Sequence, residues 1–132
     1  MTNKALRSTG FAMLLAAMVA QQADVKAFQT NCNDFNVYGV VEGPDSVQAG
    51  IAVTFTGEVS TDPSGNGPGP VNYVLYYGDG SYDRGSSGSG YLSFSRSHTY
   101  SSSGPYTVTG SFTGKTYAGD IGGCDASFTI NP

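Results

Sequence analysis

The stretch from residue 71 to residue 81, Val-Asn-Tyr-Val-Leu-Tyr-Tyr-Gly-Asp-Gly-Ser, places the tightest limits on how this chain can fold. Its first seven residues alternate, with Tyr73, Leu75 and Tyr77 on one face, and this aromatic-rich period of two predicts a β-strand. Because both faces carry apolar or aromatic groups, we expect a central strand rather than a solvated edge. Gly78-Asp79-Gly80 then predicts a tight turn, since glycine allows unusual backbone angles and an Asp side chain accepts bonds from nearby backbone N–H groups.

The composition of the chain agrees with an all-β fold. Only 12% of the 132 residues are charged and 19 are glycine, whereas long amphipathic helices need more Ala, Leu, Glu and Lys. Alternating or apolar segments predict further strands at 35–41, 51–59, 91–97, 105–113 and 124–130. Residues 42–45, 60–70, 81–90 and 114–123 are the expected breaks and loops. About seven short strands predict one immunoglobulin-like Greek-key β-sandwich over residues 31–132.

The charge of the chain argues against a nucleic-acid partner. The formal net charge is −4, and from residue 27 onward three basic and nine acidic side chains leave −6. Proteins that bind nucleic acid need a basic patch. We therefore expect no nucleic acid among the partners.

Residues 1–30 differ in composition from the rest of the chain. Lys4 and Arg7 precede an unbroken apolar run at 11–20, and two glutamines follow it. A basic head, an apolar run and a polar exit are typical of a secretory signal peptide, and Val25-Lys26-Ala27 offers small residues for cleavage. The run is shorter than the roughly 20 residues that cross a bilayer. We expect no membrane span, and a secreted, extracellular or cell-surface location.

A retained assembly segment is the alternative interpretation of residues 1–30. Read as a helix, the segment gathers apolar side chains on one face, and such a face needs a partner to cover it. These side chains are Phe11, Leu14, Leu15, Met18, Val25 and Phe28. On this interpretation the segment joins copies of the chain into a homo-oligomer or filament.

The two cysteines, Cys32 and Cys124, flank nearly the whole β-rich region. A pair at the two ends of a small domain favours a disulfide over a zinc site, because structural zinc takes four ligands. In an oxidising compartment such a bridge adds roughly 4–5 kcal/mol of stability by the loop-entropy model. The alternative is two unrelated buried thiols.

Three segments, taken in order, resemble the PKD domain, the immunoglobulin-like module named after the polycystic kidney disease protein. Residues 49–57 resemble its second strand, and residues 75–81 resemble its Trp-Asp-Phe-Gly-Asp-Gly signature. Residues 97–109 are similar to its His-x-Tyr element followed by Gly-x-Tyr-x-Val. The resemblance covers about residues 36–131 and implies a sandwich that binds carbohydrate or protein. Leu75 and Tyr76 stand where the family usually has Trp and Asp, so we expect a repacked core and a less acidic surface beside the turn.

The sequence offers few routes to catalysis. His98 is the single histidine, and it lies in the segment that resembles the His-x-Tyr element. We expect its imidazole to bond a nearby turn. Gly78, Asp79, Gly80, His98 and Tyr100 are therefore assigned to a structural turn. With no Ser-His-Asp spacing to argue from, we assign no catalytic residue and expect a protein that is not an enzyme.

A calcium site is one hypothesis for the loop at 62–67. Asp62, Ser64 and Asn66 present oxygen atoms at alternate positions before a glycine, as at the start of an EF-hand loop. The resemblance adds that some PKD domains bind calcium in this loop. Tyr73 stands where an EF-hand has its bidentate Glu, so a solvated turn without any cofactor is the favoured interpretation.

Several tyrosines are candidates for an interaction surface. Tyr76, Tyr82, Tyr91 and Tyr117 could stack on sugars or pack on a partner protein, while the alternative is that they fill the core. Taken together, the sequence favours a structural or adhesive extracellular protein that self-assembles into a surface filament. A small secreted module that binds carbohydrate or protein is the alternative.

Overall fold

A computed structural model describes residues 27–34, 36–61, 67–117 and 119–131 of the chain. Eight strands make up the regular structure of this part. They are β2 (Ala27–Asp34), β3 (Val37–Pro44), β4 (Ala52–Thr61), β5 (Val71–Tyr76), β6 (Tyr82–Ser87), β7 (Tyr91–Thr99), β8 (Tyr106–Lys115) and β9 (Ile121–Ile130). Within these ranges no helix has the length and apolarity needed to cross a membrane.

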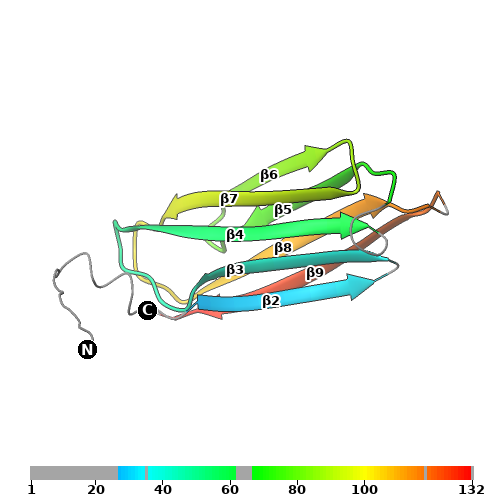
Figure 1. Cartoon of the computed structure of the whole chain (residues 1–132). Coiled ribbons are helices and arrows are strands. Elements are labelled where there is room, and N and C mark those ends of the chain that lie inside the picture. The colour runs from blue at the N-terminus through cyan, green and yellow to red at the C-terminus, as the bar shows by residue number, and fades with distance from the viewer. Residues whose placement is uncertain (1–26, 35, 62–66, 118, 132) are drawn as a thin grey trace, which may run out of the picture.

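The strands form two four-stranded sheets that pack face to face (Figure 1). One sheet has the order β2-β3-β4-β7 and the other the order β6-β5-β8-β9. Every pairing between neighbouring strands is antiparallel. The chain passes between the sheets from β4 to β5, from β6 to β7 and from β7 to β8, which is the connectivity of an immunoglobulin-like sandwich. The predicted all-β sandwich is confirmed, and β5 is an interior strand as expected.

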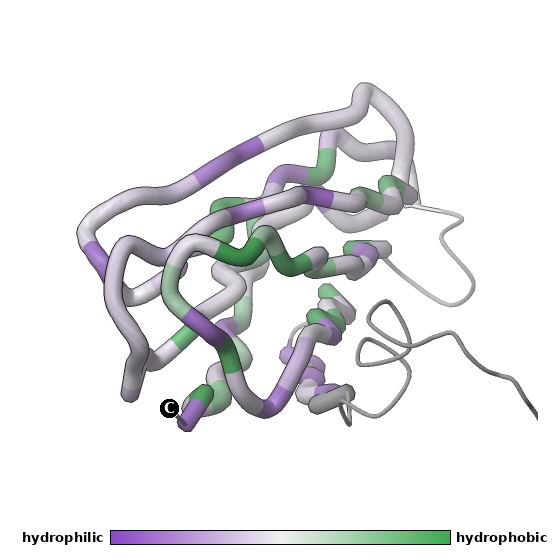
Figure 2. Tube along the Cα trace, turned by 90° about the vertical axis from the view of Figure 1, so that its left-hand side faces the viewer, coloured by the Kyte–Doolittle hydropathy of each residue, from purple (hydrophilic) through white to green (hydrophobic). Residues whose placement is uncertain are grey.

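Alternating side chains from both sheets fill the space between them. Hydrophobic and hydrophilic positions follow one another along the strands in Figure 2. With tryptophan absent, aromatic rings supply the largest buried side chains. The aromatic side chains that are at most 2% exposed are Tyr73, Tyr77, Tyr100, Phe55 and Phe112. Leu75, where the PKD family usually has Trp, is fully buried among them.

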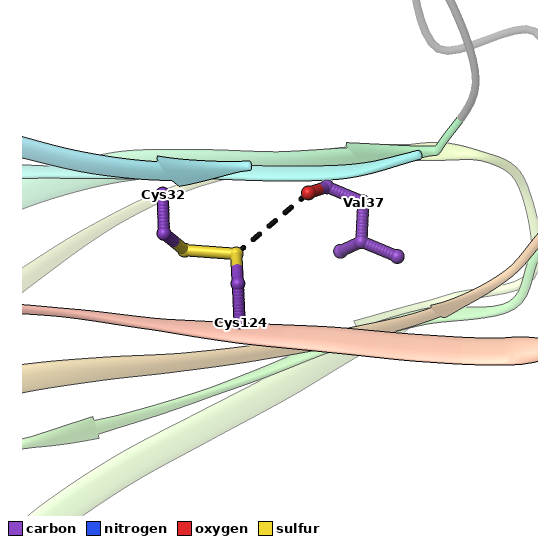
Figure 3. The surroundings of a disulfide bond; sticks show 3 residues. All are labelled: Cys32, Val37 and Cys124. Carbon is purple, nitrogen blue, oxygen red and sulfur yellow. Dashed lines mark hydrogen bonds between the residues drawn. A yellow bond between two sulfur atoms is a disulfide. The ribbon is translucent and has the colours of Figure 1, made fainter. Parts of the chain in front are cut away.

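A disulfide closes one side of the sandwich, where β2 packs beside β9. The Cys32 and Cys124 sulfur atoms are 2.03 Å apart, and the Cα atoms are separated by 5.8 Å (Figure 3). Cys124 Sγ also lies 3.7 Å from the carbonyl oxygen of Val37. An oxidised sulfur carries no proton, so this approach is a packing contact. The bridge ties the first described strand to the last.

An arginine closes the opposite side, between the edge strands β6 and β7. Arg96 Nε donates to the hydroxyl of Tyr73 at 2.7 Å, and its Nη2 donates to the carbonyl oxygen of Arg84 at 3.1 Å. Phe94 stacks on Tyr73 with ring centroids 4.0 Å apart. These contacts hold an edge strand of one sheet against an edge strand of the other.

The beginning of the sandwich differs from the prediction. Strand β2 starts at Ala27, inside the range 1–30 assigned to the leader, and the first predicted strand at 35–41 becomes β3 from Val37. β2 is polar, with no alternation to reveal it, and its backbone pairs with β3 along its full length. The chain reverses at Asn36, whose φ is 62°. The apolar segment before Ala27 lies outside the described residues.

Two expected breaks are wrong. Strand β3 runs through Gly43 to Pro44, because both residues pair with the backbone of β2. Gly43 also leaves room for Phe55, since a Cβ there would lie 2.5 Å from Cδ1 of that ring. Strand β6 occupies much of the expected loop at 81–90. Edge strands need backbone pairing rather than apolar side chains, and β6 pairs with β5 from Val71 to Tyr76. In the same way, β8 extends to Lys115 and β9 starts at Ile121.

Candidate functional site: the β5–β6 hairpin

The hairpin of β5 and β6 turns at the Gly-Asp-Gly segment. The backbone N–H of Tyr77 donates to the carbonyl of Ser81 at 3.1 Å and closes the turn. Gly78 and Gly80 have φ values of 89° and 96°, which side chains disfavour. A Cβ at Gly78 would also lie 2.5 Å from the carbonyl oxygen of Thr107. Both glycines are therefore needed for this turn.

The carboxylate of Asp79 organises the turn from within. Its Oδ1 accepts bonds from the backbone N–H of Ser81 at 3.0 Å and from the Ser81 hydroxyl at 2.5 Å. Its Oδ2 lies 2.8 Å from Nε2 of His98 on β7. Partial burial raises the pKa of Asp79, but the bonds from Ser81 and His98 outweigh it and hold the pKa below its usual value. The charged carboxylate is thus the form that the turn stabilises.

His98 is held by aromatic rings on two sides. Its imidazole lies parallel to the ring of Tyr77, with centroids 3.9 Å apart and an interplanar angle of 1°. The edge of Tyr100 meets it at 4.6 Å, and Tyr106 stacks on Tyr100 at 4.2 Å. The hydroxyl of Tyr100 donates to the carbonyl oxygen of Tyr77 at 2.9 Å. We call Tyr77, Asp79, Ser81, His98 and Tyr100 the turn clamp, because they join the hairpin to β7 and the chain that follows it.

The turn clamp brings a serine, a histidine and an aspartate together without the geometry of a hydrolase. A triad needs the carboxylate on one ring nitrogen of histidine and the serine on the other. Here Nε2 of His98 faces both Asp79, at 2.8 Å, and Ser81, at 3.5 Å. The Ser81 hydroxyl donates to Asp79 instead of to a histidine base. The arrangement orients a turn rather than activating a nucleophile.

A second set of polar bonds fixes the inner face of the hairpin. The hydroxyl of Tyr77 donates to Oδ2 of Asp83 at 2.5 Å. Burial, with the bonded carboxylate of Asp83, raises the pKa of Tyr77 well above its usual value, so the phenol stays protonated. Arg96 bonds Tyr73, which raises the pKa of this arginine too. Gly85 leaves room for Tyr73, since a Cβ there would lie 2.8 Å from that ring.

The outer face of the hairpin carries three cross-strand pairs. They are Tyr76–Tyr82, Val74–Arg84 and Asn72–Ser86, and together we call them the hairpin strip. The rings of Tyr76 and Tyr82 are exposed, with centroids 5.9 Å apart. Beside them, Asn72, Val74, Arg84 and Ser86 border a hollow of about 500 Å³. The strip is a shallow surface that combines aromatic rings, a cation and hydrogen-bonding groups.

The other tyrosines predicted for an interaction surface are exposed but lie elsewhere. Tyr91, on β7, is on the opposite sheet from the strip, and its pKa is raised by a hydrogen bond to Glu58. Tyr117 follows β8. Among the four predicted tyrosines, Tyr76 and Tyr82 form a ring pair on one face of the sheet.

Several predicted site residues lie outside the described residues. These are Asp62, Ser64 and Asn66 of the calcium hypothesis and Phe11, Leu14, Leu15, Met18 and Val25 of the assembly face. The backbone of Phe28 lies in β2. Within the described ranges, no three His, Cys, Asp or Glu side chains come together to hold a metal.

Sequence reasoning missed Asp83, Arg84 and Arg96. Asp83 and Arg84 fell in the expected loop at 81–90, although Tyr82, Arg84 and Ser86 alternate with Asp83 and Gly85. That period of two could have revealed the strand and its two faces. Arg96 lies in a strand that was predicted, but its contact with Tyr73 joins residues that are 23 positions apart.

Comparison with known proteins finds a solved structure that has a similar fold. No protein-family model and no curated protein matches the chain. A solved structure, the PKD domain of an M14-like peptidase from a Thermoplasmatales archaeon, matches with a TM-score of 0.52 and 23% sequence identity. The match covers 78% of this chain and 97% of that domain. The resemblance seen in the three sequence segments is thus confirmed at the level of the fold, and the chain folds as a divergent PKD-like sandwich.

Proposed function

We propose that this chain is a non-enzymatic, extracellular structural or adhesive protein that assembles into a surface filament through its N-terminal segment. The observation that carries the proposal is the link from that segment into the sandwich. Residues 1–26 lead directly into β2, and Cys32 of β2 is bonded to Cys124 of β9. A pull applied through the segment would therefore reach both sheets through covalent bonds.

The extracellular location is supported by the same disulfide. Disulfides persist in oxidising compartments and are rare in the cytosol. The basic head and apolar run of residues 1–20 also suit export from the cell. The turn clamp supports a non-enzymatic role, because it uses its serine, histidine and aspartate to hold a turn.

The experiment compares the secreted full chain with a variant that lacks residues 1–26. Both are imaged by negative-stain electron microscopy, and the N-terminus of each product is sequenced. We expect filaments from the full chain with its segment retained, and dispersed particles from the truncated variant. Dispersed particles from a full chain with an intact N-terminus, or filaments from the truncated variant, would contradict the proposal.

A small secreted binding module is the second candidate function, and the hairpin strip favours it. Exposed aromatic patches mark interaction sites, and this strip sets two tyrosines beside an arginine. A cleaved leader with dispersed particles in the experiment above would support this candidate over the filament.

A further inference from the structure

The two tyrosines of the hairpin strip form an aromatic platform. Tyr76 is 46% exposed and Tyr82 is 54% exposed, and their rings meet at an angle of 46°. A phenol offers an apolar face for the C–H surface of a sugar ring and a hydroxyl for its polar edge. Tyrosine also loses little conformational entropy on binding, since it has only two side-chain torsions. The pair therefore suits a ligand that is apolar on its faces and polar around its rim.

The hollow beside the platform supplies hydrogen-bonding groups. Its volume of about 500 Å³ lies within the usual range for ligand sites, roughly 300–1,000 Å³. Asn72 Nδ2 donates one bond, at 3.3 Å, to the Thr113 hydroxyl, which leaves its second N–H and its carbonyl oxygen for a ligand. The hydroxyl of Ser86 adds another donor and acceptor. Such groups match the hydroxyls of a carbohydrate.

The charge of the strip selects an acidic ligand. Within the described residues the Arg84 guanidinium forms no ion pair, while Arg96 is engaged by Tyr73 and by a backbone carbonyl. Asp125, the acid on the same face, lies across β5 and β8 from Arg84. Guanidinium groups bind carboxylates through paired, charge-assisted hydrogen bonds. Arg84 is therefore the group of the strip that can pair with a carboxylate, although residues 27–132 as a whole carry a net charge of −6.

The outer face of the other sheet offers a contrast. Its hollow of about 280 Å³ is bordered by Glu42 and Glu58, which would repel an acidic ligand. Tyr91, on that sheet, is as exposed as Tyr76 but has Glu58 as its neighbour. The charge of the two faces directs an acidic ligand to the hairpin strip.

We propose that the hairpin strip binds an acidic oligosaccharide that contains uronic-acid residues. Tyr76 and Tyr82 pack on the sugar rings, Arg84 pairs with a carboxylate, and Asn72 and Ser86 bind hydroxyls. The turn clamp holds the hairpin in the shape that presents these groups. The inference rests on the extracellular adhesive function proposed above, and it supplies the class of surface to which the protein adheres.

The test is calorimetric titration of the full chain with tetragalacturonate, and with cellotetraose as the neutral probe. We expect binding of tetragalacturonate that weakens as salt rises. Tyr82→Ala and Arg84→Gln should each weaken it roughly tenfold or more, with unchanged melting temperatures. Two matched controls, Tyr91→Ala on the other sheet and Lys115→Gln outside the strip, should change affinity by less than about twofold.

Four outcomes would overturn the inference. The first is no binding of tetragalacturonate, and the second is binding that neither Tyr82→Ala nor Arg84→Gln weakens. The third is an affinity for cellotetraose equal to that for tetragalacturonate, which would show that the strip does not select an acidic sugar. Equally tight binding of an oligoglutamate peptide that Tyr82→Ala does not weaken would likewise show that the strip does not select a sugar. A chain that binds tetragalacturonate through the strip but forms no filaments contradicts only the filament proposal. A chain that forms filaments but does not bind tetragalacturonate in the calorimetric titration contradicts only this inference.

Discussion

The hydroxyl of Tyr100 donates a 2.9 Å hydrogen bond to the backbone carbonyl oxygen of Tyr77, 23 residues earlier in the chain. Tyr100 is fully buried, and Tyr77 is the last residue before the Gly-Asp-Gly turn. The bond therefore anchors the β5–β6 hairpin to the connection that follows β7. Burial also raises the pKa of Tyr100, so the phenol remains a donor at neutral pH.

Tyr100→Phe should destabilise the fold by about 1–2 kcal/mol. The substitution leaves the carbonyl of Tyr77 buried without its partner, and an unsatisfied buried acceptor costs about 1–3 kcal/mol. Urea denaturation of the two proteins measures the difference. Tyr82→Phe, at an exposed ring, is the control and should be close to neutral. Equal stability of Tyr100→Phe and the wild type would mean that the anchoring bond contributes nothing.

Asp79→Asn should lower stability at neutral pH by about 1 kcal/mol, because it weakens charge-assisted bonds in the turn. The folded-state pKa of Asp79 lies below its unfolded value. Its contribution is therefore present above the unfolded pKa of about 3.9 and is lost as pH falls through the folded pKa. The stability gap between wild type and variant should thus close on acidification. Denaturation curves at neutral and acid pH test this, and a gap that widens in acid would contradict it.

The Cys32→Ser/Cys124→Ser double variant should lose roughly 4–5 kcal/mol of unfolding free energy, because the bridge closes a loop of 92 residues in the unfolded chain. Thermal denaturation with and without reductant measures the loss. The wild type should become less stable in reductant, and the double variant should not respond. A wild type that is equally stable in both conditions would show that the bridge adds no stability.

Gly39→Ala should destabilise the fold by about 1–3 kcal/mol through overpacking. Gly39 is buried on β3, and a Cβ there would overlap the ring of Phe112 on the facing sheet. Gly88→Ala is the matched control, because a Cβ at Gly88 meets no atom within 4 Å. Guanidinium denaturation should separate the two variants. If both variants are neutral, the sheets can move apart at Gly39 without cost.

The sequence by itself determined the class of fold and its central strand. Tyr73, Leu75 and Tyr77 alternate regularly, and burial on one face of a strand requires that period. The Gly-Asp-Gly turn was also readable, because its glycines take backbone angles that few other residues accept. The two cysteines predicted their own pairing, since they stand at opposite ends of a small domain.

Only the tertiary structure decided the edge strands and the contacts between sheets. β2 and β6 are polar segments made into strands by backbone pairing with a neighbour, so their side chains carry little signal. The hairpin strip depends on register, which sets Tyr76 opposite Tyr82 and Val74 opposite Arg84. The stacking of His98 on Tyr77 joins positions 21 residues apart. Such contacts form only when the folded sheets bring together residues that are far apart in the chain. Local sequence patterns do not show which of these residues will meet.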